Sequence, residues 1–228
     1  MATNAHDVAA AVLARGGPVE AMQLQKLVYY SQAWHLALLD EPLFMDTIQA
    51  WRDGPVALTL WEQHRGLRNV HGWPPGNPEK LSETSAKVVS LVCEVYGRLS
   101  GDDLSELTHS ELPWRTARVG ASNSERSKAI IRHDVMKQFY RTRSLARRSV
   151  ADLVSGGLNS FSPELDSVER RHILAGLREE LRQTPPVDEP GSPEPFGSAF
   201  HTHRDHNEPP LVTARLNRER PRRDSASQ

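Results

Sequence analysis

The segment that most constrains the fold of this chain runs from Met22 to Leu39. Its apolar residues recur at helical spacing on more than one face, so a helix here is apolar around most of its circumference. Lys26 is the only formally charged residue between Glu20 and Asp40. The segment also contains three glutamines and one histidine, too much polarity for a bilayer-spanning helix. Because an apolar helix in water must be enclosed by others, we expect it to be the buried central helix of a mainly α domain.

The flanking patterns predict one compact helical domain over residues 1–142 with a small β-strand element. Asn4 or Thr3 is expected to cap a first helix that ends at Gly16-Gly17, and residues 47–51 alternate as a short strand does. Asp53 or Gly54 is expected to cap the next helix, with Pro55 at its first position. Further helices are expected after Ser82, around Leu104 and Leu107, from Pro113, and around Val135 to Tyr140.

The composition changes after residue 142. Residues 143–183 are predicted to be a charged linker with a helix at about 162–182, where Ser162 and Pro163 can start it. Eight of the sixteen prolines of the chain fall in residues 184–228 among mostly polar residues. Such a composition cannot bury enough apolar surface to fold, so this tail is predicted to be disordered.

Charge and cysteine content narrow the class of protein. The formal net charge is -1, so no general attraction to nucleic acid or to a membrane is expected. The single cysteine, Cys93, lies in an apolar run that predicts a buried thiol, as a reducing cytoplasm would allow. No secretory signal or membrane-spanning segment is recognisable in the sequence, and we expect a cytoplasmic protein without a cofactor.

Three segments combine polar and aromatic residues in an unusual way: 25–35, 51–56 and 107–118. Together they resemble the Panacea domain of the SocA-like antitoxin family, which includes phage-associated proteins of the GepA type. The resemblance covers about residues 5–141, and the extension from Arg143 departs from it. Its carriers are Lys26, Tyr29, Trp34, His35, Trp51, Gly54, Pro55, Thr108, His109, Glu111, Pro113, Trp114 and Arg118.

The resemblance implies a bacterial antitoxin of a toxin–antitoxin pair. Such a protein binds and blocks a cognate toxin protein that a neighbouring gene encodes. Some relatives are instead similar to adaptors that deliver the toxin to a protease, which makes a protease an alternative partner. Because members of the family resemble one another while pairing with unrelated toxins, the shared residues can be structural and leave the contact surface free to vary.

Each of these carriers also has a structural interpretation. His35 on an apolar helix is expected to be a hydrogen-bonded core residue, and the three tryptophans Trp34, Trp51 and Trp114 are expected to be core or boundary aromatics with partners for their indole N–H groups. Gly54-Pro55 is expected to be a turn. Thr108 can donate to a backbone carbonyl near a helix end, and Glu111 could pair locally with Arg115 or Arg118.

An enzyme is the main alternative. His35, His109, Glu111 and His133 could converge as metal ligands or as an acid–base set. However, the sequence has no H-E-x-x-H spacing, no glycine-rich phosphate loop and no nucleophile motif. The histidines at 201, 203 and 206 resemble a metal-binding tract, but they fall in the tail that is predicted to be disordered.

Two candidate interaction regions remain. Arg141, Arg143, Arg147 and Arg148, with Arg132 and Lys137 upstream, could neutralise phosphates, yet they also suit the solvated face of a last helix, and nucleic acid is not the favoured partner. The long loop at 66–81 contains three prolines. Within it, Val70, His71 and Trp73 are expected to be exposed and are nominated as anchors for a protein partner.

Overall fold

The structure, a computed structural model, describes residues 2–120, 127–145, 148–155, 175–176 and 179. It confirms a compact, mainly helical domain with small two-stranded sheets. The elements in chain order are α1 (Ala5–Gly16), β1 (Val19–Glu20), α2 (Ala21–Leu39), β2 (Ile48–Trp51), β3 (Gly54–Ala57), α3 (Leu58–His64), β4 (Asn69–Val70), η1 (Pro78–Lys80), α4 (Glu83–Tyr96), α5 (Gly101–Ser110), α6 (Leu112–Ala117), α7 (His133–Arg141), β5 (Ser144–Leu145), β6 (Arg148–Ser149) and α8 (Val150–Ser155).

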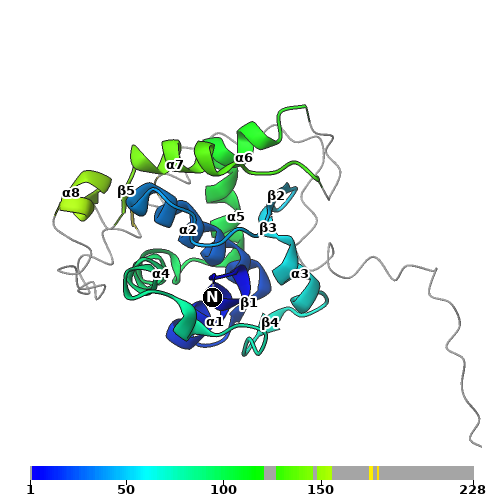
Figure 1. Ribbon diagram of the computed structural model, residues 1–228. Coiled ribbons are helices and arrows are strands. Elements are labelled where there is room, and N and C mark those ends of the chain that lie inside the picture. The colour runs from blue at the N-terminus through cyan, green and yellow to red at the C-terminus, as the bar shows by residue number, and fades with distance from the viewer. Residues whose placement is uncertain (1, 121–126, 146–147, 156–174, 177–178, 180–228) are drawn as a thin grey trace, which may run out of the picture.

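Helix α2 lies at the centre of the molecule, as its sequence predicts. All of its residues except Gln23 and Leu39 are buried. Helices α1, α4, α5 and α7 pack against it, with α1 and α4 on one side and α7 on the other (Figure 1). The helix ends where Asp40 adopts a left-handed conformation with φ 67°. Enclosure on all sides is therefore how the chain removes an almost uniformly apolar helix from water.

The predicted helix start at Pro55 is wrong. Strands β2 and β3 form an antiparallel hairpin in which Trp51 pairs with Gly54 and Ala50 with Pro55, and α3 begins only at Leu58. The backbone stays extended because the Gln25 side chain on α2 holds both peptide groups of Ala57. Its Oε1 accepts from the Ala57 N–H at 2.8 Å, and its Nε2 donates to the Ala57 carbonyl at 3.2 Å. A tertiary contact thus overrides the local preference of proline for a first helical turn.

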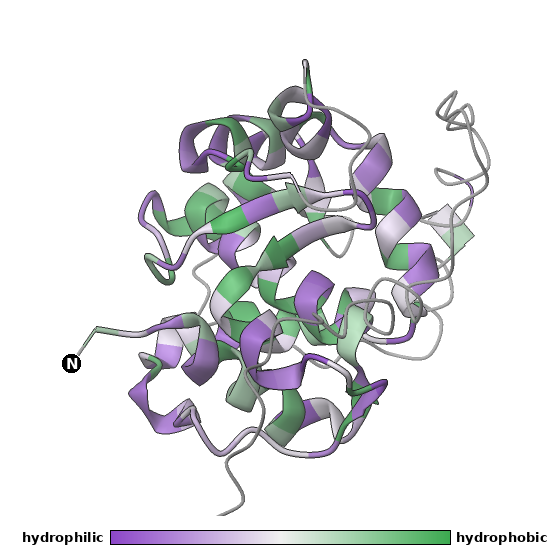
Figure 2. Cartoon of the chain, turned by 90° about the vertical axis from the view of Figure 1, so that its right-hand side faces the viewer, coloured by the Kyte–Doolittle hydropathy of each residue, from purple (hydrophilic) through white to green (hydrophobic). Residues whose placement is uncertain are grey.

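The other edge of β2 is paired with a segment far along the chain. The Ala50 N–H donates to the Ala129 carbonyl at 2.8 Å, and the Ile131 N–H donates to the Ile48 carbonyl at 2.9 Å. The β2–β3 hairpin faces the viewer in Figure 2, where hydrophobic and hydrophilic residues alternate along the surrounding helices. The segment before α7 therefore covers a strand edge that would otherwise expose unpaired backbone groups.

The expectation that Val70 and Trp73 are exposed is also wrong. Val70 is 2% exposed and pairs with Val19 of β1, while Trp73 is 8% exposed. The Trp73 indole stacks on the ring of His6 and donates to its Nδ1 at 3.1 Å. The loop lies directly on α1. A Cβ at Gly76 would lie only 1.9 Å from the His6 carbonyl oxygen, so only glycine fits at this contact. Only His71 of the three nominated residues is exposed.

The packed core continues beyond residue 142, where the compact domain was predicted to end. Leu145 and Leu153, from β5 and α8, are 0% and 2% exposed and belong to the main core. The predicted helix at 162–182 lies outside the described residues except for residues 175–176 and 179, and so does the predicted tail at 184–228 with its three histidines. In the part of the chain that the structure describes, no helix has the length and apolar character needed to cross a membrane.

Candidate functional site

The family-motif residues of all three segments meet at the turn of the β2–β3 hairpin. Lys26 projects from α2 and is completely buried, and its Nζ donates to the Pro55 carbonyl at 3.3 Å. Gly54 has φ +102°, and a Cβ there would lie 2.7 Å from Lys26 Cε and 2.9 Å from Thr108 Oγ1. Glycine is therefore needed both for the backbone conformation and for the close approach of these two side chains.

Helix α5 holds the turn from another side. The Ser105 hydroxyl donates to the Asp53 carbonyl at 2.8 Å. The Thr108 hydroxyl donates to the Ser105 carbonyl at 2.8 Å, which is the backbone hydrogen bond that its position near a helix end suggested. Helix α5 thus reaches the turn at Asp53 and Gly54, and Gly54 is also the position that Lys26 approaches from α2.

Helix α6 completes the enclosure through its aromatic and cationic side chains. The Trp114 indole donates to the Trp51 carbonyl at 2.9 Å, and Arg118 Nη1 donates to the Ala50 carbonyl at 3.0 Å. The imidazole of His109 lies against the Trp114 ring, with centroids 4.1 Å apart. Arg118 therefore binds a strand carbonyl, and its guanidinium lies over the Trp114 ring. The sequence had suggested a local pair with Glu111 instead. Pro113 stands in the first turn of α6, as predicted.

Burial dominates the electrostatics at the turn. It lowers the pKa of Lys26 to about 7, although the nearby charge of Asp53 raises it. Burial also lowers the pKa of His109 to about 3, and the neighbouring Lys26 lowers it further. A lysine with such a pKa has the basicity of catalytic lysines, but its side chain is fully buried. In this conformation the group therefore serves the packing of the hairpin.

A second polar cluster surrounds Glu111, which stands at the N-terminal boundary of α6 and is 5% exposed. The Tyr140 hydroxyl donates to Glu111 Oε2 at 2.5 Å, and the Tyr30 hydroxyl donates to Oε1 at 3.4 Å. The Tyr29 hydroxyl lies 3.4 Å from that of Tyr140. The pKa values of all three tyrosines are raised well above the usual value, first by burial and then by the charge of Glu111. These phenols are neutral donors at physiological pH.

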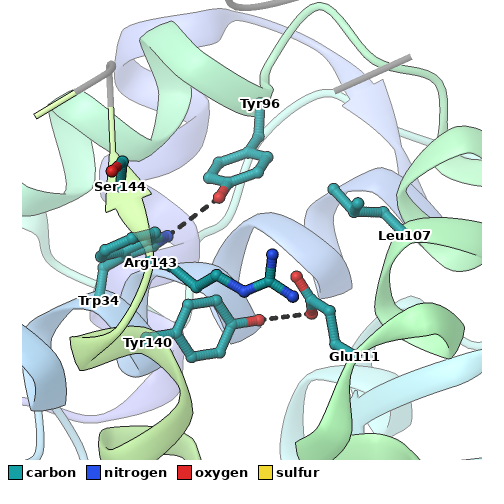
Figure 3. Close-up of a pocket in the computed structure, with 7 residues that line it drawn as sticks. All are labelled: Trp34, Tyr96, Leu107, Glu111, Tyr140, Arg143 and Ser144. Carbon is teal, nitrogen blue, oxygen red and sulfur yellow. Dashed lines mark hydrogen bonds between the residues drawn. The ribbon is translucent and has the colours of Figure 1, made fainter. Parts of the chain in front are cut away.

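A pocket of about 40 Å³ adjoins this cluster (Figure 3). This volume suffices for a few water-sized groups. Its lining comes from α2, α4, α5, α7 and the turn after α7, and comprises Trp34, Tyr96, Leu107, Glu111, Tyr140, Arg143 and Ser144. The Trp34 indole donates to the Tyr96 hydroxyl at 3.1 Å. The pocket therefore combines three aromatic side chains with one carboxylate.

The residues of the enzyme alternative do not meet. His35 is 2% exposed, and its ring nitrogens lie 2.8 Å from the Glu41 carbonyl and 3.1 Å from Ser85 Oγ. His133 Nε2 lies 3.0 Å from the side-chain nitrogen of Gln32, whereas His109 packs on Trp114. No group of three or more His, Cys, Asp or Glu residues suited to a metal ion occurs among the residues with described positions.

Much of the basic cluster is engaged in ion pairs. Lys137 and Arg141 contact Asp40 Oδ1 at 2.6 and 3.0 Å, and Arg132 contacts Asp134 at 2.6 Å. The hydrogen bond from Lys137 and the charge of Arg141 lower the pKa of Asp40. Arg147 and the side chain of Arg148 lie outside the described part of the chain. The ion pairs reduce the positive charge that this region could offer to phosphates.

Sequence reasoning did not identify the two buried glutamines of α2 as organising residues. Gln25 holds Ala57, as described above. Gln32 Oε1 accepts from the N–H groups of Leu43 and Phe44 at 2.8 and 3.1 Å. Gln32 Nε2 also donates to the Phe44 carbonyl at 2.9 Å. The available signal was the presence of long polar side chains on a helix that must be enclosed, because a buried amide requires partners. The sequence also gave no sign that Arg143 lines the pocket, because this residue lies in the extension outside the motif segments.

The comparison with known families identifies the domain. The family model described as Antitoxin SocA-like, Panacea domain, matches residues 24–115. This stretch contains all the carriers of the resemblance except Arg118. No curated protein and no solved structure matches the chain. Residues 24–115, from the central helix into α6, are therefore similar to the Panacea domain of SocA-like antitoxins.

Proposed function

We propose that this protein is the antitoxin of a toxin–antitoxin pair and that it neutralises a cognate toxin protein by direct, stable binding. The observation that carries the proposal is the match of residues 24–115 to the SocA-like antitoxin family. The hydrogen bonds of the motif residues support a binding role. Lys26, Thr108 and Trp114 are used to build and hold the β2–β3 hairpin.

We propose further that the chain is not an enzyme. A general acid or base must reach its substrate within hydrogen-bond distance. The ring nitrogens of His35 lie beside a carbonyl and a hydroxyl inside the protein, and Lys26 is completely buried. In this proposal the motif residues build the scaffold of the domain, and the toxin contacts its outer surface.

Co-expression tests the antitoxin proposal. The neighbouring gene expressed alone is expected to arrest growth, and co-expression with this chain is expected to restore it. The toxin should accumulate and copurify with the antitoxin. Toxicity that persists despite folded, full-length antitoxin would refute the proposal.

Two further measurements separate the alternatives. If the chain delivers its client to a protease, the toxin disappears from the cell unless the protease is inactivated, which would contradict neutralisation by stable binding. The variant His109→Gln tests for catalysis, because the imidazole could supply an acid or base only in an enzyme. We expect the variant to neutralise the toxin as the wild type does once its fold is verified by circular dichroism.

A further inference from the structure

The pocket beside Glu111 lies at the edge of the domain. Its inner wall is formed by Trp34 and Tyr140, both 1% exposed. Its outer rim is formed by two exposed residues, Arg143 in the turn after α7 and Ser144 at the start of β5. These two residues therefore lie on the solvent side of the pocket.

The composition of the pocket favours a cation. The faces of aromatic rings attract positive charge, and more strongly when water is excluded. Trp34, Tyr96 and Tyr140 supply the rings, and Glu111 supplies a buried negative charge. Because the Tyr140 and Tyr30 hydroxyls both donate to the carboxylate, it is held in one orientation beside the pocket.

The chain already places one of its own cations there. In Figure 3 the Arg143 side chain extends across the pocket, and its guanidinium points toward the carboxylate of Glu111. The guanidinium carbon lies 4.6 Å from the centroid of the Phe139 ring, one helical turn earlier. Arg141, two residues before it, points elsewhere and pairs with Asp40. The position beside the Glu111 carboxylate is thus taken by Arg143 and not by the basic segment in general.

We propose that the position beside Glu111 is a receptor site for the guanidinium group of an arginine side chain on a partner protein, and that the Arg143 side chain, which lines the pocket, occupies this position until the partner arrives. A planar guanidinium stacks on aromatic faces and can donate two parallel hydrogen bonds to a carboxylate, whereas an ammonium ion acts as a point charge. The exchange of one arginine for another keeps the buried carboxylate neutralised throughout. Release of Arg143 returns an exposed, well-hydrated side chain to water.

Competition from Arg143 also tunes affinity. If its guanidinium lies beside Glu111 nine-tenths of the time, the apparent affinity for any competing guanidinium falls about tenfold. Identification of the partner as the toxin rests on the proposed function. The chemistry of the pocket does not, and it can be tested with a small probe alone.

The test uses ethylguanidinium as the probe and the full chain as receptor. The Trp34 indole N–H, which donates to Tyr96 in the pocket wall, gives a nuclear magnetic resonance signal that reports occupancy and is assigned with Trp34→Phe. Arg143→Ala is expected to bind the probe at least tenfold more tightly than the wild type. The matched control Arg141→Ala removes a neighbouring arginine outside the pocket and should bind as the wild type does.

Neutral N-ethylurea has nearly the same shape as the probe and is expected not to bind Arg143→Ala. Equal probe affinity in the wild type and both variants, no binding to folded Arg143→Ala, or equal binding of N-ethylurea would each overturn the proposal. These binding measurements involve no toxin, so a negative result in them is distinct from a negative result in the co-expression test. With the toxin itself, Arg143→Ala should bind more tightly and Arg141→Ala equally well.

Discussion

The contact between Gly54 and Lys26 leads to a quantitative prediction. Replacement of Gly54 by alanine imposes two separate costs. The backbone has φ +102°, a conformation that costs an L-residue about 1–3 kcal/mol. The new Cβ would also lie 2.7 Å from Lys26 Cε and 2.9 Å from Thr108 Oγ1, and overpacking of this kind costs about 1–3 kcal/mol. We expect Gly54→Ala to lower the free energy of unfolding by about 2–6 kcal/mol.

Gly66 provides a matched control. It has φ +83°, but a Cβ there would meet nothing within 4 Å. Gly66→Ala therefore carries only the backbone cost, about 1–3 kcal/mol. The difference between the two variants measures the steric contact at the hairpin turn.

Urea unfolding followed by circular dichroism gives both values. A double-mutant cycle with Lys26→Ala should show a coupling of about 0.5–3 kcal/mol, because the shortened side chain makes room for the alanine methyl group. If Gly54→Ala destabilises the protein no more than Gly66→Ala, and the cycle shows no coupling, the close approach of Lys26 to the turn does not limit this position.

Three further predictions concern buried groups. Burial lowers the pKa of Lys26 from 10.5 to about 7, so the unfolded chain binds more protons than the native state above pH 7. The free energy of unfolding should rise with pH by up to about 1.4 kcal/mol per unit between pH 7 and 9. At higher pH the thiol of Cys93, whose pKa burial raises to about 12, opposes this rise. Lys26→Met should flatten the slope in urea titrations, and an unchanged slope would exclude Lys26 as its source. Trp73→Ala truncates a core residue and should lower the free energy of unfolding by about 3–5 kcal/mol, whereas His71→Ala, at an exposed site, should change it by no more than about 0.5 kcal/mol. Similar losses of stability in thermal melts of the two variants would contradict this difference in burial. Tyr140→Phe removes a hydroxyl donor from the buried carboxylate and should cost about 1–3 kcal/mol, and a neutral result in denaturant would show that water replaces the donor.

The central helix and most other helices could be predicted from local signals. The apolar circumference of residues 22–39 leaves enclosure as the only solution in water. The capping residues Asn4 and Ser82 start α1 and α4 because their side chains accept hydrogen bonds from the first free N–H groups of a helix. Such signals act over a few residues, so they can be read directly from the chain.

The hairpin and the loop after α3 could not be predicted in this way. Pro55 satisfies the local requirement of a helix start, yet Gln25, thirty-two residues before Ala57, holds the backbone extended. Trp73 and Val70 lie in a proline-rich stretch that suggests exposure, but α1 and β1 bury them. In both cases the deciding partner is distant along the chain.

The sequence by itself determined the helical class, the central helix and the resemblance of residues 24–115 to the Panacea domain, because hydrophobic periodicity, caps and motif residues are properties of neighbouring positions. Only the tertiary structure decided that Lys26, Gly54 and Thr108 form one contact and that Arg143 lies at a pocket with Glu111. The physical reason is that burial, hydrogen-bond partners and pKa values depend on which distant segments enclose a side chain. That enclosure is established only when the whole domain packs.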